Sequence, residues 1–155
     1  MYIEEMRNKI RHKVSFGHLQ TQEFDFVSEG EFYFDWRLVK ASEVLKLFRQ
    51  DTGEILGLMS VENVDQEWMY KINLLSVSKA NSGSRKKYDR IVGNLITYVC
   101  KRAVEDFGEK ACVILIPKTN LRQYYMDKYL FKPVGHVLCL TILEMFKLIE
   151  EYDHD

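Results

Sequence analysis

The sequence has little proline, glycine and cysteine, and it carries no excess charge of either sign. Its 155 residues include two prolines and eight glycines, too few for a fibrous or loop-rich chain. The 22 basic and 23 acidic residues nearly cancel, so the whole chain has no general attraction to nucleic acid or to an anionic membrane. No apolar run reaches the roughly 20 residues of a membrane-spanning helix. The acidic start of the chain lacks the pattern of a secretory signal, and we expect a cytoplasmic protein.

The three cysteines are Cys100, Cys112 and Cys139, and no two of them form a C-x-x-C pair. Their odd number and wide spacing argue against a disulfide framework and against a structural zinc site. Free cysteine is among the residue types that are most often buried. We therefore expect three buried thiols in a reducing compartment and no bound metal.

The residues that are present make an ordinary globular composition with many aromatics. Hydrophobic residues account for 46% of the chain, aromatic residues for 13% and charged residues for 29%. A chain of this length buries roughly 70% of its unfolded surface, which is enough for a core without metal or disulfide. We see no internal repeat and no linker, and we expect a single domain over residues 1–155.

In the first half of the chain, the spacing of the apolar residues predicts a helix followed by a series of strands. Residues 1–14 have apolar side chains at helical spacing, which predicts a short amphipathic helix. Alternating patterns then predict a series of strands, and Gly53 favours a hairpin turn between two of them. The strands are expected at residues 24–26, 32–36, 44–49, 55–62 and 68–77.

The second half of the chain changes to a mixture of helical and buried-strand patterns. Residues 88–107 carry one apolar stripe, which predicts a helix of about five turns that ends at Gly108. The short apolar run at residues 111–116 predicts a strand buried on both faces. Asn120 with Gln123 predicts a capping box at the start of the next helix. A strand at residues 136–142 and an amphipathic helix at residues 145–152 complete the mixed α/β pattern.

A basic loop connects the strand at residues 68–77 to the long helix. Residues 79–90 contain one acid, Asp89, and five basic side chains: Lys79, Arg85, Lys86, Lys87 and Arg90. Unpaired N–H groups and the dipole at a helix start favour an anion. The loop has neither the G-K-[ST] of a Walker A motif nor a G-x-G-x-x-G. A solvated basic loop without a ligand is the simpler interpretation of this segment.

The order of these elements resembles that of the GNAT superfamily of acetyl-CoA-dependent N-acetyltransferases over roughly residues 32–142. In that family a loop with the pattern Q/R-x-x-G-x-G/A binds the CoA pyrophosphate. The matching stretch is residues 86–96, where Tyr88 takes the Q/R position, Ile91 the first glycine and Gly93 the last position. A second match covers residues 114–131, in which Asn120, Tyr125 and the pair Leu130 and Phe131 take family positions.

The resemblance implies a fold and a cofactor. The fold is α/β (α+β), with a mixed, largely antiparallel sheet that is flanked by helices and splayed between its fourth and fifth strands. Acetyl-CoA would enter this gap, and its pantetheine arm would pair with the backbone of Leu75, Ser76 and Val77. The other implied cofactor contacts are Arg85, Lys86, Lys87, Tyr88, Arg90, Val92, Gly93, Asn120 and Tyr125.

The implied reaction is direct transfer of an acetyl group to a primary amine of an unknown acceptor, either a small molecule or a protein. Tyr125 would protonate the leaving CoA thiolate, and Tyr124 is the alternative side chain that faces the cofactor. A carboxylate usually takes the proton of the amine. The strand at residues 71–78 contains no acid, so Glu62 is the candidate base. Glu67 and His136 are more remote alternatives.

Two other functions stay open. The degenerate loop and the missing acid are compatible with a non-catalytic CoA-binding or regulatory module of the same fold. The basic loop could instead bind RNA or another polyanion. Nucleic-acid binders usually carry a broader basic face, and we expect no nucleic-acid partner. We also expect no membrane partner, and a homodimer remains open.

Overall fold

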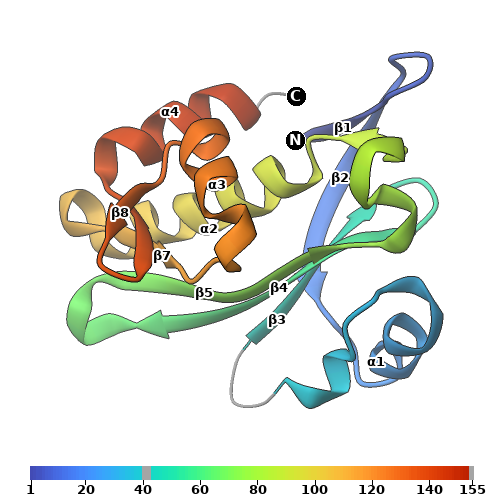
Figure 1. Cartoon of the computed structure of the whole chain (residues 1–155), viewed down its shortest axis with the longest axis horizontal. Helices are drawn as coiled ribbons and strands as arrows, with labels where there is room; N and C mark the ends of the chain where they lie inside the picture. The colour runs from blue at the N-terminus through green and yellow to red at the C-terminus, as the bar shows by residue number, and fades with distance from the viewer. Residues whose placement is uncertain (40–42, 154–155) are drawn as a thin grey trace.

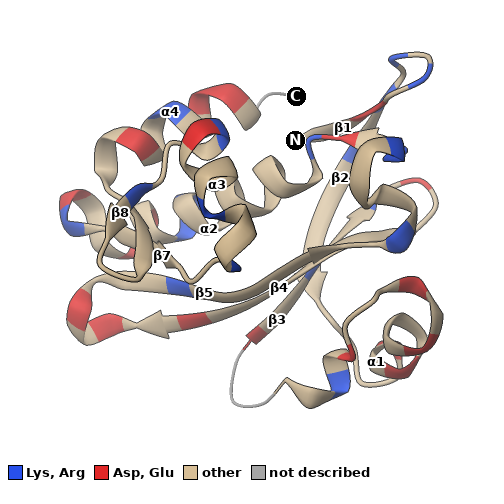
Figure 2. Ribbon diagram, in the orientation of Figure 1, with Lys and Arg blue, Asp and Glu red and all other residues tan. Residues whose placement is uncertain are grey.

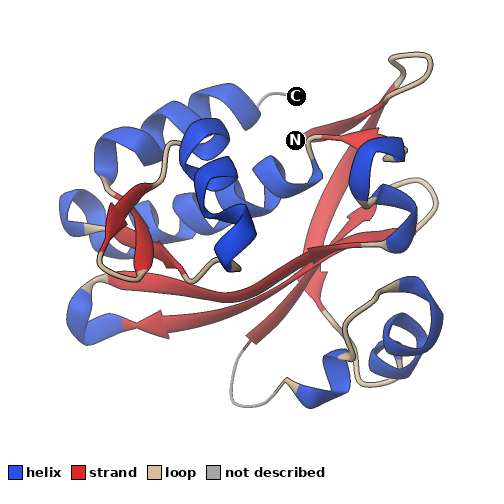
Figure 3. Ribbon diagram, viewed as in Figure 1, coloured by secondary structure: helices blue, strands red, loops and turns tan. Residues whose placement is uncertain are grey.

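Figure 1 shows a computed structural model of the chain, in which residues 1–39 and 43–153 are described. A curved sheet forms the centre, and helices cover both of its faces (Figure 3). The sheet of the described residues has the strand order β6-β1-β2-β3-β4-β5-β7-β9-β8. Its strands are β1 (Tyr2–Glu5), β2 (Arg11–His18), β3 (Glu43–Arg49), β4 (Ile55–Val64), β5 (Met69–Val77), β6 (Tyr88–Asp89), β7 (Cys112–Leu115), β8 (Lys132–Val134) and β9 (Val137–Leu140).

Three helices lie on one face of the sheet, and a short helical segment covers the other (Figure 1). The first face carries α2 (Ile91–Phe107), α3 (Arg122–Tyr129) and α4 (Ile142–Tyr152). Their apolar side chains form the main core with the sheet, with Leu95, Val99 and Leu148 fully buried. The opposite face carries α1 (Glu23–Phe26) and the turns that follow it. This segment builds a second core around Val27, Phe32 and Trp36.

The sheet is antiparallel except at one place, where β5 pairs with β7 in parallel. That pairing begins at Met69 and Cys112 and ends at Ile72 and Leu115. Beyond a register shift at Asn73, residues 74–77 of β5 continue to pair with β4 but no longer with β7. The sheet therefore splits into a fork, whose two arms are residues 73–77 and 116–118. The predicted largely antiparallel sheet that opens between these two strands is confirmed.

The N-terminal segment does not form the helix predicted for residues 1–14. It forms a hairpin of β1 and β2, whose turn contains Lys9 at a positive φ of 62°. The buried residues are Ile3 and Val14, whereas Met6 and Ile10 are 40% and 51% exposed. The apolar residues therefore have helical spacing in the sequence, but they do not form one buried face of a helix.

Two short strands that the alternating aromatics predicted are also absent. Residues 24–26 belong to α1, and residues 32–35 form an irregular segment with a bend before the 3-10 turn that begins at Trp36. The side chains of Phe32 and Trp36 are buried in the second core without any strand pairing. The alternating aromatics thus lie in an irregular segment that buries some of its side chains. Such a segment can have the same sequence pattern as a half-buried strand.

The capping box predicted at Asn120 and Gln123 is wrong. The helix α3 begins after Leu121, which makes no side-chain cap, and the Gln123 amide instead donates to Asp127 at 2.8 Å. A capping box is present at the start of α4, between Thr141 and Glu144. The long helix, its end at Gly108 and the strands at residues 44–49, 55–62 and 68–77 agree with β3, β4, β5 and α2.

The cysteines are only partly as expected. Cys100 is fully buried, but Cys112 and Cys139 are half-buried on the neighbouring strands β7 and β9, with their Sγ atoms 2.8 Å apart. Among the described residues, no helix combines the length and the hydropathy needed to cross a bilayer.

Candidate functional site

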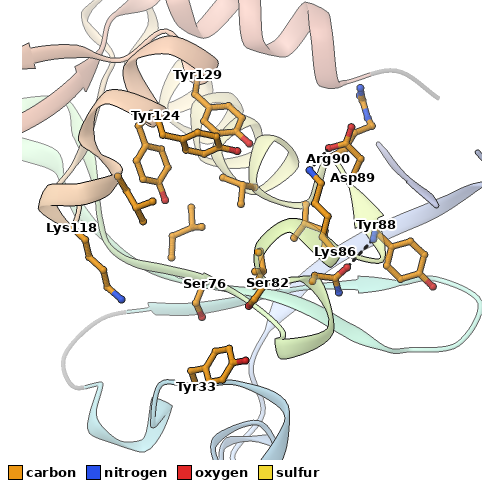
Figure 4. Close-up of a pocket in the computed structure, with 18 of the residues that line it drawn as sticks. Tyr33, Ser76, Ser82, Lys86, Tyr88, Asp89, Arg90, Lys118, Tyr124 and Tyr129 are labelled. Atoms are coloured by element: carbon orange, nitrogen blue, oxygen red, sulfur yellow. Dashed lines mark hydrogen bonds and ion pairs between the residues drawn. The ribbon is translucent and has the colours of Figure 1, made fainter. Parts of the chain in front are cut away.

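The fork opens into a pocket with a volume of about 700 Å³. One wall is the free edge of β5 at Leu75, Ser76 and Val77, and another is the loop that leads into α2. Helix α3 supplies three tyrosines from above, and Tyr33 reaches the pocket from the segment on the other face (Figure 4). Lys86 and Arg90 lie at one end of the pocket, and Lys118 lies at the opposite end (Figure 4).

The start of α2 faces this pocket at the end where Lys86 lies. Its first residues, Ile91 and Val92, line the pocket, and no side chain caps the helix. The N–H groups of the first turn have no partner within the helix, and the helix dipole adds positive potential. This end of the pocket is therefore suited to an anionic group such as a phosphate.

The residue that turns the chain into α2 is Arg90, which has a positive φ of 80°. That conformation is strained for any residue other than glycine. The Arg90 side chain compensates by binding three carbonyl groups, of Tyr2 at 3.3 Å, Glu151 at 3.2 Å and Tyr152 at 3.4 Å. Its guanidinium also lies 4.2 Å and 4.7 Å from the ring centres of Tyr2 and Tyr152. Both ends of the chain thus hold the helix start in place.

The loop before α2 is organised by Asn81, which is 5% exposed. Its side-chain oxygen accepts a hydrogen bond from the Tyr88 N–H at 2.9 Å, and its amide donates to the Ser78 hydroxyl at 2.8 Å. The Tyr88 ring is buried, and its hydroxyl accepts a hydrogen bond from Arg49 at 2.8 Å. These contacts give a fixed shape to a loop that the sequence presents as polar and flexible.

Replacing Asn81 with alanine is expected to lower the free energy of unfolding by about 1–3 kcal/mol, because the buried Tyr88 N–H then loses its acceptor. Urea denaturation measures this loss. Asn120→Ala is the matched control, since Asn120 is exposed, and it should change stability by no more than about 0.5 kcal/mol. Equal effects of the two substitutions would contradict the role of Asn81.

Asp89 is the one acidic residue among the described residues that line the pocket. Its carboxylate accepts a hydrogen bond from the Lys86 ammonium at 2.9 Å. Burial raises the pKa of Asp89, but Lys86 and the Arg90 backbone outweigh it, and the net pKa is below its ordinary value. Asp89 therefore holds Lys86 at the pocket wall, and because an ammonium group has three N–H donors, Lys86 can bind a phosphate at the same time.

The tyrosines of α3 form a cluster above the fork. Tyr125 and Tyr129 are buried at 7% and 3% exposure, while Tyr124 is 45% exposed. The Tyr125 ring centre lies 5.9 Å from that of Tyr124 and 6.0 Å from that of Tyr129. Burial raises the pKa of Tyr125 to about 12, and burial with Tyr124 nearby also raises the pKa of Tyr129. Their hydroxyls are therefore protonated at neutral pH.

The structure brings together most of the site residues that the sequence predicted, and it leaves others outside. The predicted residues that line the pocket are Leu75, Ser76, Val77, Lys86, Tyr88, Arg90, Val92 and Tyr125. The predicted residues that do not line it are Glu62, Arg85, Lys87, Gly93 and Asn120.

The residues outside the pocket have identifiable positions. Glu62 is exposed and pairs in register with Lys71, beyond the closed end of the fork, so the geometry does not bring it to the pocket. The Lys87 ammonium lies 5.2 Å from the centre of the Tyr88 ring. Gly93 faces Tyr152, because a Cβ atom there would lie 2.2 Å from that ring. Arg85 is exposed on the loop.

Several pocket residues were not predicted from the sequence. Asn81, Tyr129 and Lys118 lie in segments that the sequence analysis considered, but no local pattern distinguishes them from neighbouring polar or aromatic residues. Tyr33 was expected on a strand and instead stands 77% exposed at the pocket. These residues meet only because the fold brings four separate segments to the fork.

No family model matches the sequence, and no curated protein matches it. Solved structures do match. The structure of AtaTR bound with AcCoA has a TM-score of 0.60 and 9% identity, covering 88% of this chain and 98% of that one. A GNAT-family acetyltransferase from Listeria monocytogenes has a TM-score of 0.53 and 14% identity, covering 92% and 100%. Arabidopsis thaliana Naa50, in complex with the bisubstrate analogue CoA-Ac-MVNAL, has a TM-score of 0.56 and 12% identity, covering 83% and 99%.

Proposed function

We propose that this chain, which has the fold of the GNAT acetyltransferases, binds acetyl-CoA in the fork and transfers its acetyl group to a primary amine. The observation that carries the proposal is the pocket itself. It joins a free strand edge, an uncapped helix start and buried protonated tyrosines in one cavity of about 700 Å³. These are the parts needed to hold an acyl donor with an extended arm and an anionic end.

The residues present fit such a donor along its length. The α2 start and Lys86 would hold the pyrophosphate, and the open edge at Leu75 to Val77 would pair with the amides of the arm. The Ser76 hydroxyl is buried and has no hydrogen-bond partner among the described residues. A buried, unpartnered hydroxyl is unusual in a folded protein. Because this one points away from the α3 tyrosines (Figure 4), the acceptor and not the donor would provide its partner.

The transfer needs a neutral amine, an anion-stabilising donor and an acid. A backbone N–H on the β5 edge would stabilise the charge that develops on the thioester oxygen, an effect worth about 3–4 kcal/mol per donor in other enzymes. Tyr125 would donate its proton to the departing thiolate. Because Asp89 is the one acid of the described pocket lining and lies at the phosphate end, the amine would lose its proton to water.

Acetyl-CoA is expected to stabilise the protein by about 2.7 kcal/mol at a concentration near 100-fold its Kd. A thermal-shift titration detects this gain. Lys86→Ala should weaken the affinity roughly tenfold, since a charged hydrogen bond contributes about 1.5–3 kcal/mol. Lys87→Ala is the matched control, because Lys87 does not line the pocket, and its Kd should stay near that of the parent. No shift at millimolar acetyl-CoA would overturn the proposal.

A second candidate is a CoA-binding module without turnover, favoured by the lack of a carboxylate at the acyl end of the described pocket lining. The two functions differ in one measurement. Release of free CoA thiol in the presence of an amine panel supports the transferase. Binding of acetyl-CoA with no release above the buffer rate supports the module.

A further inference from the structure

The pocket end away from α2 has a chemistry of its own. Lys118 lies three positions after the last paired residue of β7, on the second arm of the fork. In Figure 4 its side chain extends toward the side of the fork where Tyr33 lies, and the Ser76 hydroxyl points the same way. Tyr33, Ser76 and Lys118 lie on the face opposite the tyrosines of α3. We call these three residues the acceptor mouth, since an acceptor would approach the acetyl group from this face.

The acceptor mouth is cationic. Lys118 is exposed and makes no ion pair with another described residue. The Lys79 ammonium adds a second positive charge, 5.2 Å from the ring centre of Tyr33. Asp89, the one acid of the described lining, is bound to Lys86 at the other end of the pocket. A positively charged acceptor would thus meet like charge at this end.

The acidic residues near the acceptor mouth are directed elsewhere. Figure 2 shows acidic positions on the α1 segment, which lies beside the mouth. Asp25, Glu29 and Asp35 all bind the Arg37 guanidinium, at 3.2, 3.3 and 2.9 Å. None of these acids lines the pocket. They bind an exposed arginine of their own segment, and none of them supplies a carboxylate inside the pocket.

We infer that the acceptor of the proposed transfer is an amine that also carries an acidic group, a carboxylate or a phosphate, bound by Lys118 and the Ser76 hydroxyl. The inference rests on the proposed function and names the substrate class of the same site. An ammonium and a hydroxyl are hydrogen-bond donors that match an anionic oxygen. The Lys118 charge also disfavours the protonated form of a nearby amine, which assists attack where no carboxylate base is present.

The test compares amines with and without the acidic group, with the full chain at saturating acetyl-CoA and with each rate expressed per neutral amine, because the two members of a pair differ in amine pKa. The pairs are amino acids against their carboxamides, and phosphoethanolamine against ethanolamine, with spermidine as the cationic amine. CoA release should give a kcat/KM about tenfold or more higher for the acid-bearing member of a pair. A larger kcat/KM ratio for the amino acids indicates a carboxylate on the acceptor, and a larger ratio for phosphoethanolamine indicates a phosphate.

The variant series assigns the preference to Lys118. Lys118→Ala should bring the ratio near one through a higher KM for the amine, and Lys118→Arg should retain it. The Kd for acetyl-CoA should not change in either variant. Lys147→Ala is the matched control, because Lys147 is exposed on α4 away from the pocket lining, and it should behave like the parent.

Failure of the inference and failure of the proposed function are separable. If acetyl-CoA does not bind, the proposed function and the inference fall together. If acetyl-CoA binds and the carboxamides, ethanolamine or spermidine react equally well or better, the inference alone is overturned. If no amine reacts, binding is measured instead, by isothermal titration of the acid-bearing amines into the CoA-saturated protein. Absence of binding by the acid-bearing amines at millimolar concentration, or binding that is unchanged in Lys118→Ala, overturns it as well.

Discussion

Replacing Tyr125 with phenylalanine is expected to slow acetyl transfer about 100-fold and to leave the Kd for acetyl-CoA nearly unchanged, since a positioned general acid contributes roughly 10²–10⁴-fold. The substitution removes the hydroxyl from a side chain that lines the pocket and is 7% exposed, with little change in packing. The pKa of Tyr125 is raised to about 12, so the proton donor is present at every lower pH. The loss should therefore be the same across the neutral range.

Single-turnover release of the CoA thiol measures this rate directly. Tyr124→Phe and Tyr129→Phe are the matched controls, because both tyrosines line the same pocket. A 100-fold loss in Tyr125→Phe alone assigns the proton donor to Tyr125. A loss confined to Tyr124→Phe would move the role to that residue, and three unchanged rates would show that no tyrosine of α3 donates the proton.

The central part of the fold was predictable because the spacing of its apolar residues in the sequence matches the faces that are buried in the structure. The strands β3, β4 and β5 and the helix α2 have patterns that match their buried faces, such as Leu95 and Val99 on α2. The N-terminal hairpin was not predictable in this way. Met6 and Ile10 completed a helical pattern, yet both are substantially exposed, and the hairpin is defined by pairing with β3 and β6.

The segments that form the pocket could be predicted, but the backbone conformation of its loop could not. The basic loop and the tyrosines do meet at the fork, as the resemblance implied. The resemblance places the glycine positions of the motif at Ile91 and Gly93, whereas the residue with a positive φ between Tyr88 and Gly93 is Arg90. Arg90 tolerates this conformation through carbonyl groups at both ends of the chain, and no local sequence pattern reports such distant partners.

Replacing Gly93 with alanine is expected to destabilise the protein by about 1–3 kcal/mol, the usual cost of overpacking. A Cβ atom at this position would lie 2.2 Å from the Tyr152 ring, which is 4% exposed and has little room to move. Alanine in place of glycine within a helix would otherwise stabilise by roughly 1 kcal/mol. The sign of the effect therefore distinguishes a packing glycine from an ordinary helical one, and urea denaturation measures it.

The sign should reverse when the ring is removed. In a Tyr152→Leu background the atoms that meet the new Cβ are gone, and Gly93→Ala should then be neutral or stabilising by up to about 1 kcal/mol. Gly30→Ala is the control, because a Cβ there meets nothing within 4 Å. Displacing Tyr152 also disturbs Arg90, whose guanidinium lies 4.7 Å from that ring centre, so acetyl-CoA should bind more weakly to Gly93→Ala. A variant with parental stability that has lost only acetyl-CoA affinity would instead place Gly93 in the cofactor loop, as the resemblance implied.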